Sequence, residues 1–495
     1  MTLETAELGP ALRTFLACGL ILDPWLAGLV DEHFSFESQD VVARAADGLA
    51  GAHWREPLIS RTLGGLPALK SLGRRAVSEV ATATAAALAH ERVGRICVDA
   101  AMAEEAVQRL ERFIARVGFG PLVLIFLAVS VTESQGALAH YGRLSEEEFT
   151  SGARHRPWAR GALDEELVAG LAAGNYRLQV CDGRRWVVST AGGRRLLSGL
   201  RQTLADSGFF AERLRLTWVS HFNLTQGQNW DRLVASLLPH VDALRLRFTG
   251  ALGLRPGMRV LDVGCGNGAQ IVAGGLWKAV GASGRVVGLD PAVSMLEAAR
   301  WRVEAAGARN VRFVQGWAEA LPFVRADFDL TFSLSTLELT DAPRALAEMT
   351  RVTRPGGTVV VHGISGGGLD NPVVRDWFRP VLRLAKGFGI DPGGRSGVYL
   401  RLPELFRAAG LSEVQEVRGE LGLVLTDPVF TAQEVLQTNG LVQEVLERLP
   451  WAARQDVLVE LVERGRAVCA RTAPSARALT LPTHTVRGTV PAAAC

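Results

Sequence analysis

The segment Val260–Gly268, with the sequence VLDVGCGNG, constrains the fold of this chain more than any other feature of it. A short, mainly apolar run leads into three glycines that alternate with other residues. Glycine is needed there because the backbone must turn tightly and a ligand must come close to it, which a Cβ atom would prevent. The segment therefore predicts a buried strand, a tight turn and the start of a helix.

From Gly253 onward the chain alternates short apolar runs with helical patterns, which predicts a parallel sheet covered on both faces. Strands are expected at 258–263, 285–289, 311–314, 328–333, 357–362 and 478–490, and helices at 268–280, 292–306 and 342–353. Residues 363–401 are interpreted as an insertion, because two glycine-rich stretches enclose an apolar helix there.

Two aspartates accompany the glycine turn. Asp262 lies inside the first strand, where the dinucleotide-binding loops that also fit this glycine pattern usually have an apolar residue. A buried carboxylate needs a compensating partner, such as a cationic ligand. Asp290 ends the second strand, where a carboxylate can accept hydrogen bonds from both hydroxyls of a ribose. Asp290 therefore indicates a ribose without identifying the rest of the ligand.

Three later segments indicate which ribose-containing ligand this glycine turn is built to bind. They are Val314–Phe323, Phe328–Leu330 and Thr353–Gly357. Together with the glycine turn and Asp290, they resemble in order and spacing the motifs of class I S-adenosylmethionine-dependent methyltransferases. The resemblance is strong over residues 254–362 and loose over 402–490. It implies an α/β, Rossmann-like, doubly wound and mostly parallel sheet of seven strands, with S-adenosyl-L-methionine as the cofactor. It also disfavours a nicotinamide-dependent oxidoreductase.

The resemblance further implies which residues hold each part of the cofactor. By position these are Gly264, Cys265, Gly266 and Gly268 along the amino-acid and ribose portion, Pro291 and Met295 beside the adenine, Ala318 with its backbone at the adenine edge, and Ser333 and Leu334 facing the methionine portion. Asp290 is expected to hold the ribose hydroxyls, and Asp262 to interact nearby, directly or through water.

Trp317 departs from the family pattern. Family members very often carry an aspartate after the glycine of this segment, where it accepts a hydrogen bond from the adenine amino group. Trp317 at that position leaves two interpretations open. The indole contacts the adenine, or it packs against the N-terminal region, as many interfacial aromatic residues do.

Glu338 and His362 are the candidate catalytic residues. Glu338 lies a few residues past the fourth strand and His362 ends the fifth, and the carboxyl ends of these strands meet at the cleft of such a sheet. A general base is needed only if the methyl acceptor must lose a proton, since much of the acceleration comes from proximity and orientation. Each residue also has a structural interpretation: Glu338 as a favourable charge at a helix start, and His362 as a hydrogen-bonded histidine at a strand end. No metal site is predicted, because the six cysteines are far apart and form no Cys/His cluster.

The N-terminal part, residues 1–245, is predicted to be a mainly α-helical domain that precedes a methyltransferase domain at 246–495. Within it, residues 163–210 follow the order helix, hairpin and helix, which is similar to part of a winged-helix module. Arginines cluster around the hairpin, so this segment either binds DNA or closes the acceptor site and dimerises, as in small-molecule O-methyltransferases. The attached methyltransferase domain favours the second role, with a homodimer as one consequence and no nucleic-acid partner.

Composition sets outer limits on the function. The chain is 48% hydrophobic and 21% charged with a net charge of +3, which suits a globular protein with no need for a polyanionic partner. Residues 117–131 are uncharged but too short for the roughly 20 residues of a membrane span, so a buried helix is predicted. The N-terminus lacks a signal-peptide pattern, and we expect a soluble, cytoplasmic protein.

The sequence thus predicts methyl transfer to a small-molecule acceptor, with oxygen as the first candidate for the accepting atom. The alternative is a regulator that senses S-adenosylmethionine, binds nucleic acid through residues 163–210 and has lost turnover.

Overall fold

The computed structural model describes residues 135–150, 170–210, 240–366, 369–390, 394–431, 439–447 and 451–492, with single residues and short runs outside these ranges, among them Phe222 and 230–232. The chain divides into two compact units, Met1–Thr217 with Leu446–Glu460 and Trp218–Val445 with Leu461–Cys495. The buried helix predicted at 117–131 lies outside the described residues, as do most of residues 1–134 of the helical domain predicted at 1–245.

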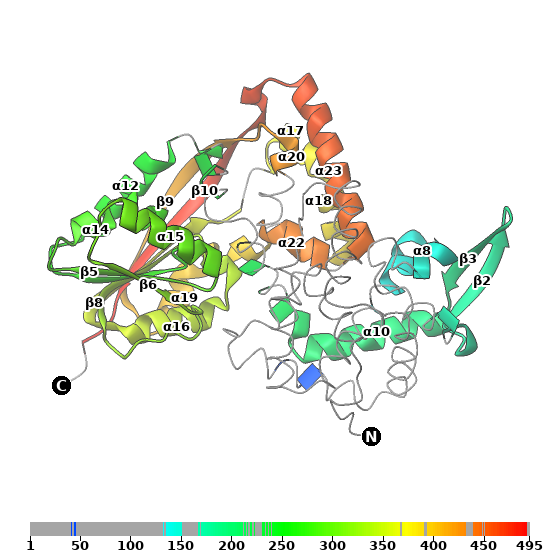
Figure 1. The fold of residues 1–495 in the computed structure, drawn as a ribbon, viewed down its shortest axis with the longest axis horizontal. Helices are drawn as coiled ribbons and strands as arrows, with labels where there is room; N and C mark the ends of the chain where they lie inside the picture. Colours follow the sequence, from blue (N-terminus) through cyan, green and yellow to red (C-terminus); the bar gives the residue numbers. More distant parts are fainter. Residues whose placement is uncertain are drawn as a thin grey trace, which may run out of the picture. The chain divides into compact units, whose positions relative to one another are not determined.

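A seven-stranded sheet runs through the second unit (Figure 1). In spatial order its strands are β6 (Val311–Gln315), β5 (Arg285–Asp290), β4 (Arg259–Val263), β7 (Phe328–Leu334), β8 (Thr353–Ile364), β10 (Ala478–Thr489) and β9 (Ser412–Val424). Strands β6 to β8 pair in parallel, and β10 runs antiparallel to both β8 and β9. The predicted doubly wound, mostly parallel sheet is confirmed. Because the chain passes from β4 to β5 and β6 and then crosses back to β7, strands β4 and β7 flank the point where ligands bind in such sheets.

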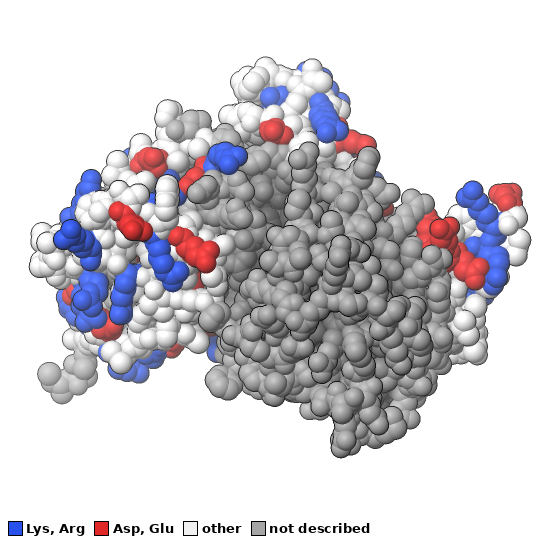
Figure 2. Space-filling model, viewed as in Figure 1, with Lys and Arg blue, Asp and Glu red and all other residues white. Residues whose placement is uncertain are grey.

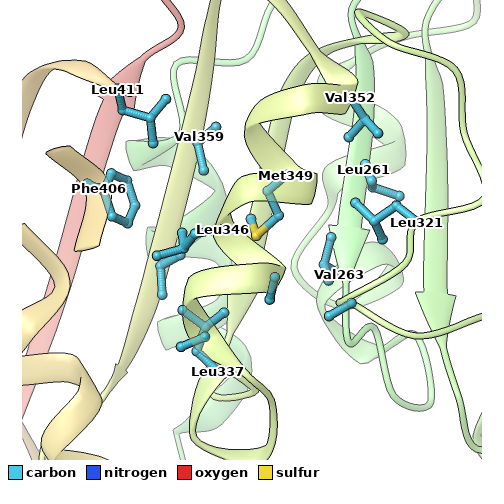
Figure 3. Close-up of a cluster of buried hydrophobic side chains, with 14 of the residues drawn as sticks. Leu261, Val263, Leu321, Leu337, Leu346, Met349, Val352, Val359, Phe406 and Leu411 are labelled. Atoms are coloured by element: carbon cyan, nitrogen blue, oxygen red, sulfur yellow. The ribbon is translucent and has the colours of Figure 1, made fainter. Parts of the chain in front are cut away.

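Helices cover both faces of this sheet (Figure 1). One layer contains α12 (Val241–Ala251), α13 (Ala269–Val272), α14 (Leu276–Ala279) and α15 (Val293–Ala305), and the other contains α16 (Ala342–Val352) and α19 (Leu402–Ala408). In the second layer, Met349 of α16 lies between Val359 of β8 and Leu261 of β4, and all three side chains are fully buried (Figure 3). Packing on both faces fixes the strand ends from which the site is built.

The prediction of one helix at 268–280 is wrong, since the structure has two short helices there. Gly275 has a φ of +74° and lies between α13 and α14. A residue in the left-handed region interrupts the helical hydrogen-bond ladder, and glycine adopts that conformation without the strain that a Cβ atom would add.

The insertion at 363–401 contains two short helices and a 3₁₀ segment in place of the one apolar helix predicted. These are α17 (Pro372–Trp377), α18 (Arg379–Phe388) and η4 (Gly394–Arg401). Trp377 is fully buried and donates its indole N–H to the carbonyl oxygen of Leu461, at 2.8 Å, in α23 (Trp451–Arg471). Gly465 of α23 permits this approach, because a Cβ atom there would lie 2.4 Å from the indole ring. The short helices α20 (Pro428–Phe430) and α22 (Gly440–Glu447) precede α23.

The first unit contains the predicted hairpin. Strands β2 (Tyr176–Cys181) and β3 (Arg184–Ser189) pair antiparallel around Asp182 and Gly183, whose φ values of +52° and +72° suit a two-residue hairpin turn. The short strand β1 (Leu144–Ser145) pairs with β3 and is followed in the chain by α8 (Glu146–Thr150). Helix α10 (Ala191–Asp206) follows the hairpin. The hairpin and the helix after it are confirmed, whereas the winged-helix assignment stays a prediction.

Charges of both signs are intermixed on the surface of the described residues. Figure 2 shows acidic and basic side chains side by side over the visible face of the second unit. At the hairpin, Arg185 forms an ion pair with Glu146 of α8. No helix among the described residues has the length and apolar character needed to cross a membrane. Within the same residues, no group of three or more His, Cys, Asp or Glu side chains could hold a metal ion.

Candidate functional site

The glycine turn after β4 requires glycine at specific positions. Gly264, Gly266 and Gly268 have φ values of +78°, +52° and +72°, all in the left-handed region. A Cβ atom on Gly264 would lie 2.3 Å from the hydroxyl oxygen of Thr336, just after β7. The backbone N–H groups of Gly264 and Cys265 donate to the carbonyl oxygen of Leu289, at 2.8 and 2.9 Å, and so tie the turn to β5. The turn is therefore fixed against both neighbouring strands.

Asp290, the last residue of β5, reaches back to this turn. Its Oδ2 accepts a hydrogen bond of 2.8 Å from the backbone N–H of Gly266, and its Oδ1 accepts one of 2.9 Å from the N–H of Ala292. Burial raises the pKa of this carboxyl to about 6, and the two hydrogen bonds oppose the rise. The structure thus brings Asp290 and Gly266 together at the carboxyl edge of the sheet.

Asp262 is more deeply buried, with 1% of its surface exposed. Its Oδ2 has no hydrogen-bond partner among the described residues. Burial and, to a lesser extent, the charge of Asp290 raise the pKa of the Asp262 carboxyl well above its usual value. A buried carboxylate oxygen without a donor is costly. It therefore fits a ligand that brings a positive charge or hydrogen-bond donors to this place.

The other predicted cofactor-binding residues surround the same edge. The backbone N–H of Gly316 donates to the carbonyl oxygen of Asp290 at 3.2 Å, which places Trp317 and Ala318 just beyond the end of β5. Gln315 donates its side-chain amide to the carbonyl oxygen of Pro291 at 3.1 Å, and Met295 is buried one turn into α15.

Ser333 and Leu334 end β7 beside the turn. The β4–β7 register pairs Asp262 with Phe332 and Val263 with Ser333, so Ser333 and Asp262 point to opposite faces of the sheet. The Ser333 hydroxyl is fully buried and has no partner among the described residues. Leu334 pairs with His362 of β8. The structure thus places Ser333 and Leu334 at the predicted strand end but does not join Ser333 to the Asp262 carboxylate.

Glu338 lies in the 3₁₀ turn η3 (Leu337–Leu339), directly after β7. Its Oε2 accepts a hydrogen bond from the hydroxyl of Tyr399, whose side chain is fully buried in η4. Gly363 makes room for the tyrosine, because a Cβ atom there would lie 2.0 Å from the ring. Burial raises the pKa of Glu338 to about 7, although the residue keeps partial exposure to solvent. A carboxyl group with this pKa can accept and release a proton near neutral pH.

His362 is held differently. Its Nδ1 lies 2.7 Å from the hydroxyl of Thr485 in β10, and its ring lies 5.5 Å from that of Phe248. Burial, together with the charge of His484, lowers the pKa of His362 to about 4. The imidazole is therefore neutral at pH 7 and a weak base, so of the two candidates Glu338 is better suited to take a proton.

Comparison with known proteins identifies the kind of domain that the second unit contains. A family model described as a methyltransferase domain matches residues 260–357, the part that carries the glycine turn, Asp290 and Glu338. The second unit carries a class I methyltransferase domain. Its cofactor is S-adenosyl-L-methionine.

Individual relatives match the methyltransferase domain over a limited length. The demethylmenaquinone methyltransferase of Staphylococcus aureus is 42% identical over 117 residues, which are 23% of this chain and 47% of that relative. That of Bacillus cereus is 39% identical over 110 residues, 22% of this chain and 46% of the relative. The chain thus spans about half the length of the curated relatives it matches. Among solved structures, the YcgJ protein of Bacillus subtilis is 19% identical, with a TM-score of 0.34, over 51% of this chain and 100% of that one.

Sequence reasoning missed several residues around this domain's site. Tyr399 is one of only three tyrosines in the chain and lies in the glycine-rich insertion, which was the available signal. Thr336 and Thr485 carried no signal of their own, because their roles depend on strands that only the fold brings together.

Replacing Trp317 with alanine tests the adenine contact. We expect S-adenosylhomocysteine to bind about tenfold more weakly, since stacking of a base on an aromatic side chain contributes about 1–3 kcal/mol. Calorimetric titration measures this loss, and thermal denaturation should show little change. Trp301→Ala is the matched control, because Trp301 is 64% exposed on α15. A fall in melting temperature with unchanged affinity would instead show that Trp317 is a packing residue.

Proposed function

We propose that this protein transfers the methyl group of S-adenosylmethionine to an oxygen atom of a small-molecule acceptor, with Glu338 as the general base. The observation that carries the choice of oxygen is the Glu338 carboxyl group, desolvated and partly exposed two residues after Thr336, which contacts the glycine turn. A hydroxyl acceptor must lose a proton as it is methylated, and a base with a pKa near the working pH accepts it most effectively.

The position of Glu338 supports this role. Thr336, two residues earlier, has its hydroxyl 3.5 Å from the carbonyl oxygen of Gly264 in the cofactor-binding turn. Glu338 therefore lies two residues after a residue that touches this turn. Tyr399 holds the Oε2 atom of Glu338. The second carboxylate oxygen, Oε1, is then the one that would take the acceptor's proton.

The remaining residues would bind and orient the cofactor. Asp290 would accept hydrogen bonds from the ribose hydroxyls, and Asp262 would compensate the positive charge of the amino-acid portion. S-adenosylmethionine supplies an activated methyl group, which leaves the sulfonium sulfur as the acceptor oxygen bonds to it. The acceptor's proton passes to Glu338, so that charge and atoms balance, and the turn and strand ends keep the reacting atoms in line.

A small acceptor is also favoured by the relatives. By their name they methylate demethylmenaquinone, and their likeness to this chain is confined to less than a quarter of its length. From these relatives we infer only that the acceptor of this protein is a small molecule.

The test is formation of S-adenosylhomocysteine by the full chain with a panel of phenols, quinols and aliphatic alcohols, followed by mass spectrometry of the products. We expect at least one hydroxyl compound to gain a methyl group that mild acid does not remove. Methylation at carbon or nitrogen alone would contradict the oxygen assignment while keeping the methyltransferase.

A further inference from the structure

Asp231 joins the segment that precedes the sheet to the cofactor-binding turn. Its Oδ1 accepts a hydrogen bond of 2.9 Å from the side-chain amide of Asn267, which lies between Gly266 and Gly268. Its Oδ2 accepts one from the guanidinium of Arg302, in the last turn of α15. One carboxylate thus connects three segments that are far apart in the sequence.

Arg302 also contacts the backbone of Asn267. Its Nε donates to the backbone carbonyl oxygen of Asn267 at 3.1 Å. Asn267 is only 3% exposed, and its own Oδ1 accepts from the N–H of Ala269 at 3.3 Å, at the start of α13. The backbone and side chain of Asn267 are therefore both held, and Asp231 provides an acceptor for its buried amide group.

The orientation of Asn267 matters because its neighbours are the residues that would meet the cofactor. Gly266 donates its N–H to Asp290, and Gly268 is packed so closely that a Cβ atom would lie 3.0 Å from that of Ala299. A shift of Asn267 would move both glycines, whose left-handed backbone leaves little freedom to compensate.

The same segment has a second contact with α15. The hydroxyl of Ser294, in the first turn of α15, donates to the carbonyl oxygen of Phe222 at 3.2 Å. The rings of Phe222 and Trp230 meet edge to face with centroids 5.4 Å apart. Phe222 and Asp231 therefore contact opposite ends of the helix that begins beside Asp290.

We propose that Asp231 is a positioning residue for the cofactor, which holds Asn267 so that Gly266 and Gly268 keep the backbone conformation that receives S-adenosylmethionine. The inference rests on the proposed function, because it assigns Asp231 to the same cofactor site. Asp231 acts through Asn267 and Arg302 and does not itself touch the cofactor.

The experiment compares Asp231→Ala with Asp242→Ala in the whole 495-residue chain. Asp242 also forms an ion pair with an arginine, Arg245, at 2.7 Å, but it is 67% exposed on α12 and does not contact the turn. Calorimetric titration should show S-adenosylhomocysteine binding about tenfold more weakly to the Asp231 variant and unchanged to the Asp242 variant. Both variants should melt within about 3 °C of the unchanged protein. In turnover, KM for the cofactor should rise while kcat at saturating cofactor stays the same.

Unchanged affinity in Asp231→Ala would overturn the proposal and leave Asp231 as a stabilising contact only. Should that variant fail to fold, Asp231→Leu keeps the approximate size of the side chain and still removes the acceptor for the Asn267 amide. A measurable loss of affinity in it supports the proposal, and none overturns it. Binding needs no methyl acceptor, so a protein that binds S-adenosylhomocysteine but methylates nothing would contradict the proposed function and still decide the role of Asp231.

Discussion

Replacing Glu338 with glutamine should lower kcat by about 10²- to 10⁴-fold and leave the affinity for S-adenosylhomocysteine nearly unchanged, because general-base catalysis contributes about that much and the substitution keeps the size of the side chain. The dependence of kcat on pH tests the same role of Glu338. Burial raises the pKa of Glu338 to about 7, and the base must be deprotonated to act. In the unchanged protein kcat should therefore rise with pH through about 7 and level off above it, and the variant should lose this dependence.

Tyr399→Phe provides the internal check on this result. The tyrosine hydroxyl donates to the Glu338 carboxylate and so favours its charged form. Its removal should move the rise in kcat to higher pH. Tyr141→Phe is the matched control, because Tyr141 also donates its hydroxyl to a carboxylate, Asp456, in the other unit. A pH profile that is the same in Glu338→Gln and in the unchanged protein would remove Glu338 from the mechanism.

Replacing Asp290 with alanine should weaken the binding of S-adenosylhomocysteine by about tenfold to more than a hundredfold. The estimate follows from losing a charged acceptor for two ribose hydroxyls, about 1.5–3 kcal/mol. The loss also includes the support that the carboxylate gives to the N–H groups of Gly266 and Ala292. Calorimetric titration of the variant measures it directly.

Glu297→Ala controls for a change of net charge, since Glu297 is exposed on α15. Asp290→Asn keeps a side-chain oxygen for the turn and separates loss of charge from loss of shape. Full affinity in both Asp290 variants would contradict the assignment of the ribose site.

The sequence was most informative where function depends on consecutive residues. The turn from Val260 to Gly268 and the carboxylate that ends β5 could be predicted, because a tight turn and a strand end impose residue types at fixed spacing. The strands of the sheet could be predicted for the same reason, since apolar runs alternate with helical patterns. The parallel pairing was predicted from this alternation, and the doubly wound arrangement of seven strands followed from the family resemblance.

Contacts between distant segments could not be predicted in this way. Tyr399 meets Glu338 across 61 residues, and Asp231 meets Arg302 across 71. No local period or motif relates such pairs, and only the packed insertion and the segment before the sheet bring them together. The break between α13 and α14 was missed for a different reason: Gly274-Gly275 was visible in the sequence, but a glycine pair inside a helical pattern lowers helix propensity without fixing where the helix ends.

The burial of Asp290 makes the stability of the folded chain depend on pH and on bound cofactor. In the folded chain the pKa of Asp290 is about 6, above its ordinary value, so the folded state binds a proton more tightly than the unfolded one. Without ligand, the contribution of Asp290 to stability is therefore greatest in acid and is lost as pH rises through 6. At neutral pH the ribose hydroxyls of a bound cofactor would instead donate hydrogen bonds to the charged carboxylate. Ligand at a hundred times its Kd adds about 2.7 kcal/mol to the free energy of unfolding, so resistance to proteolysis should rise and fall with the supply of S-adenosylmethionine.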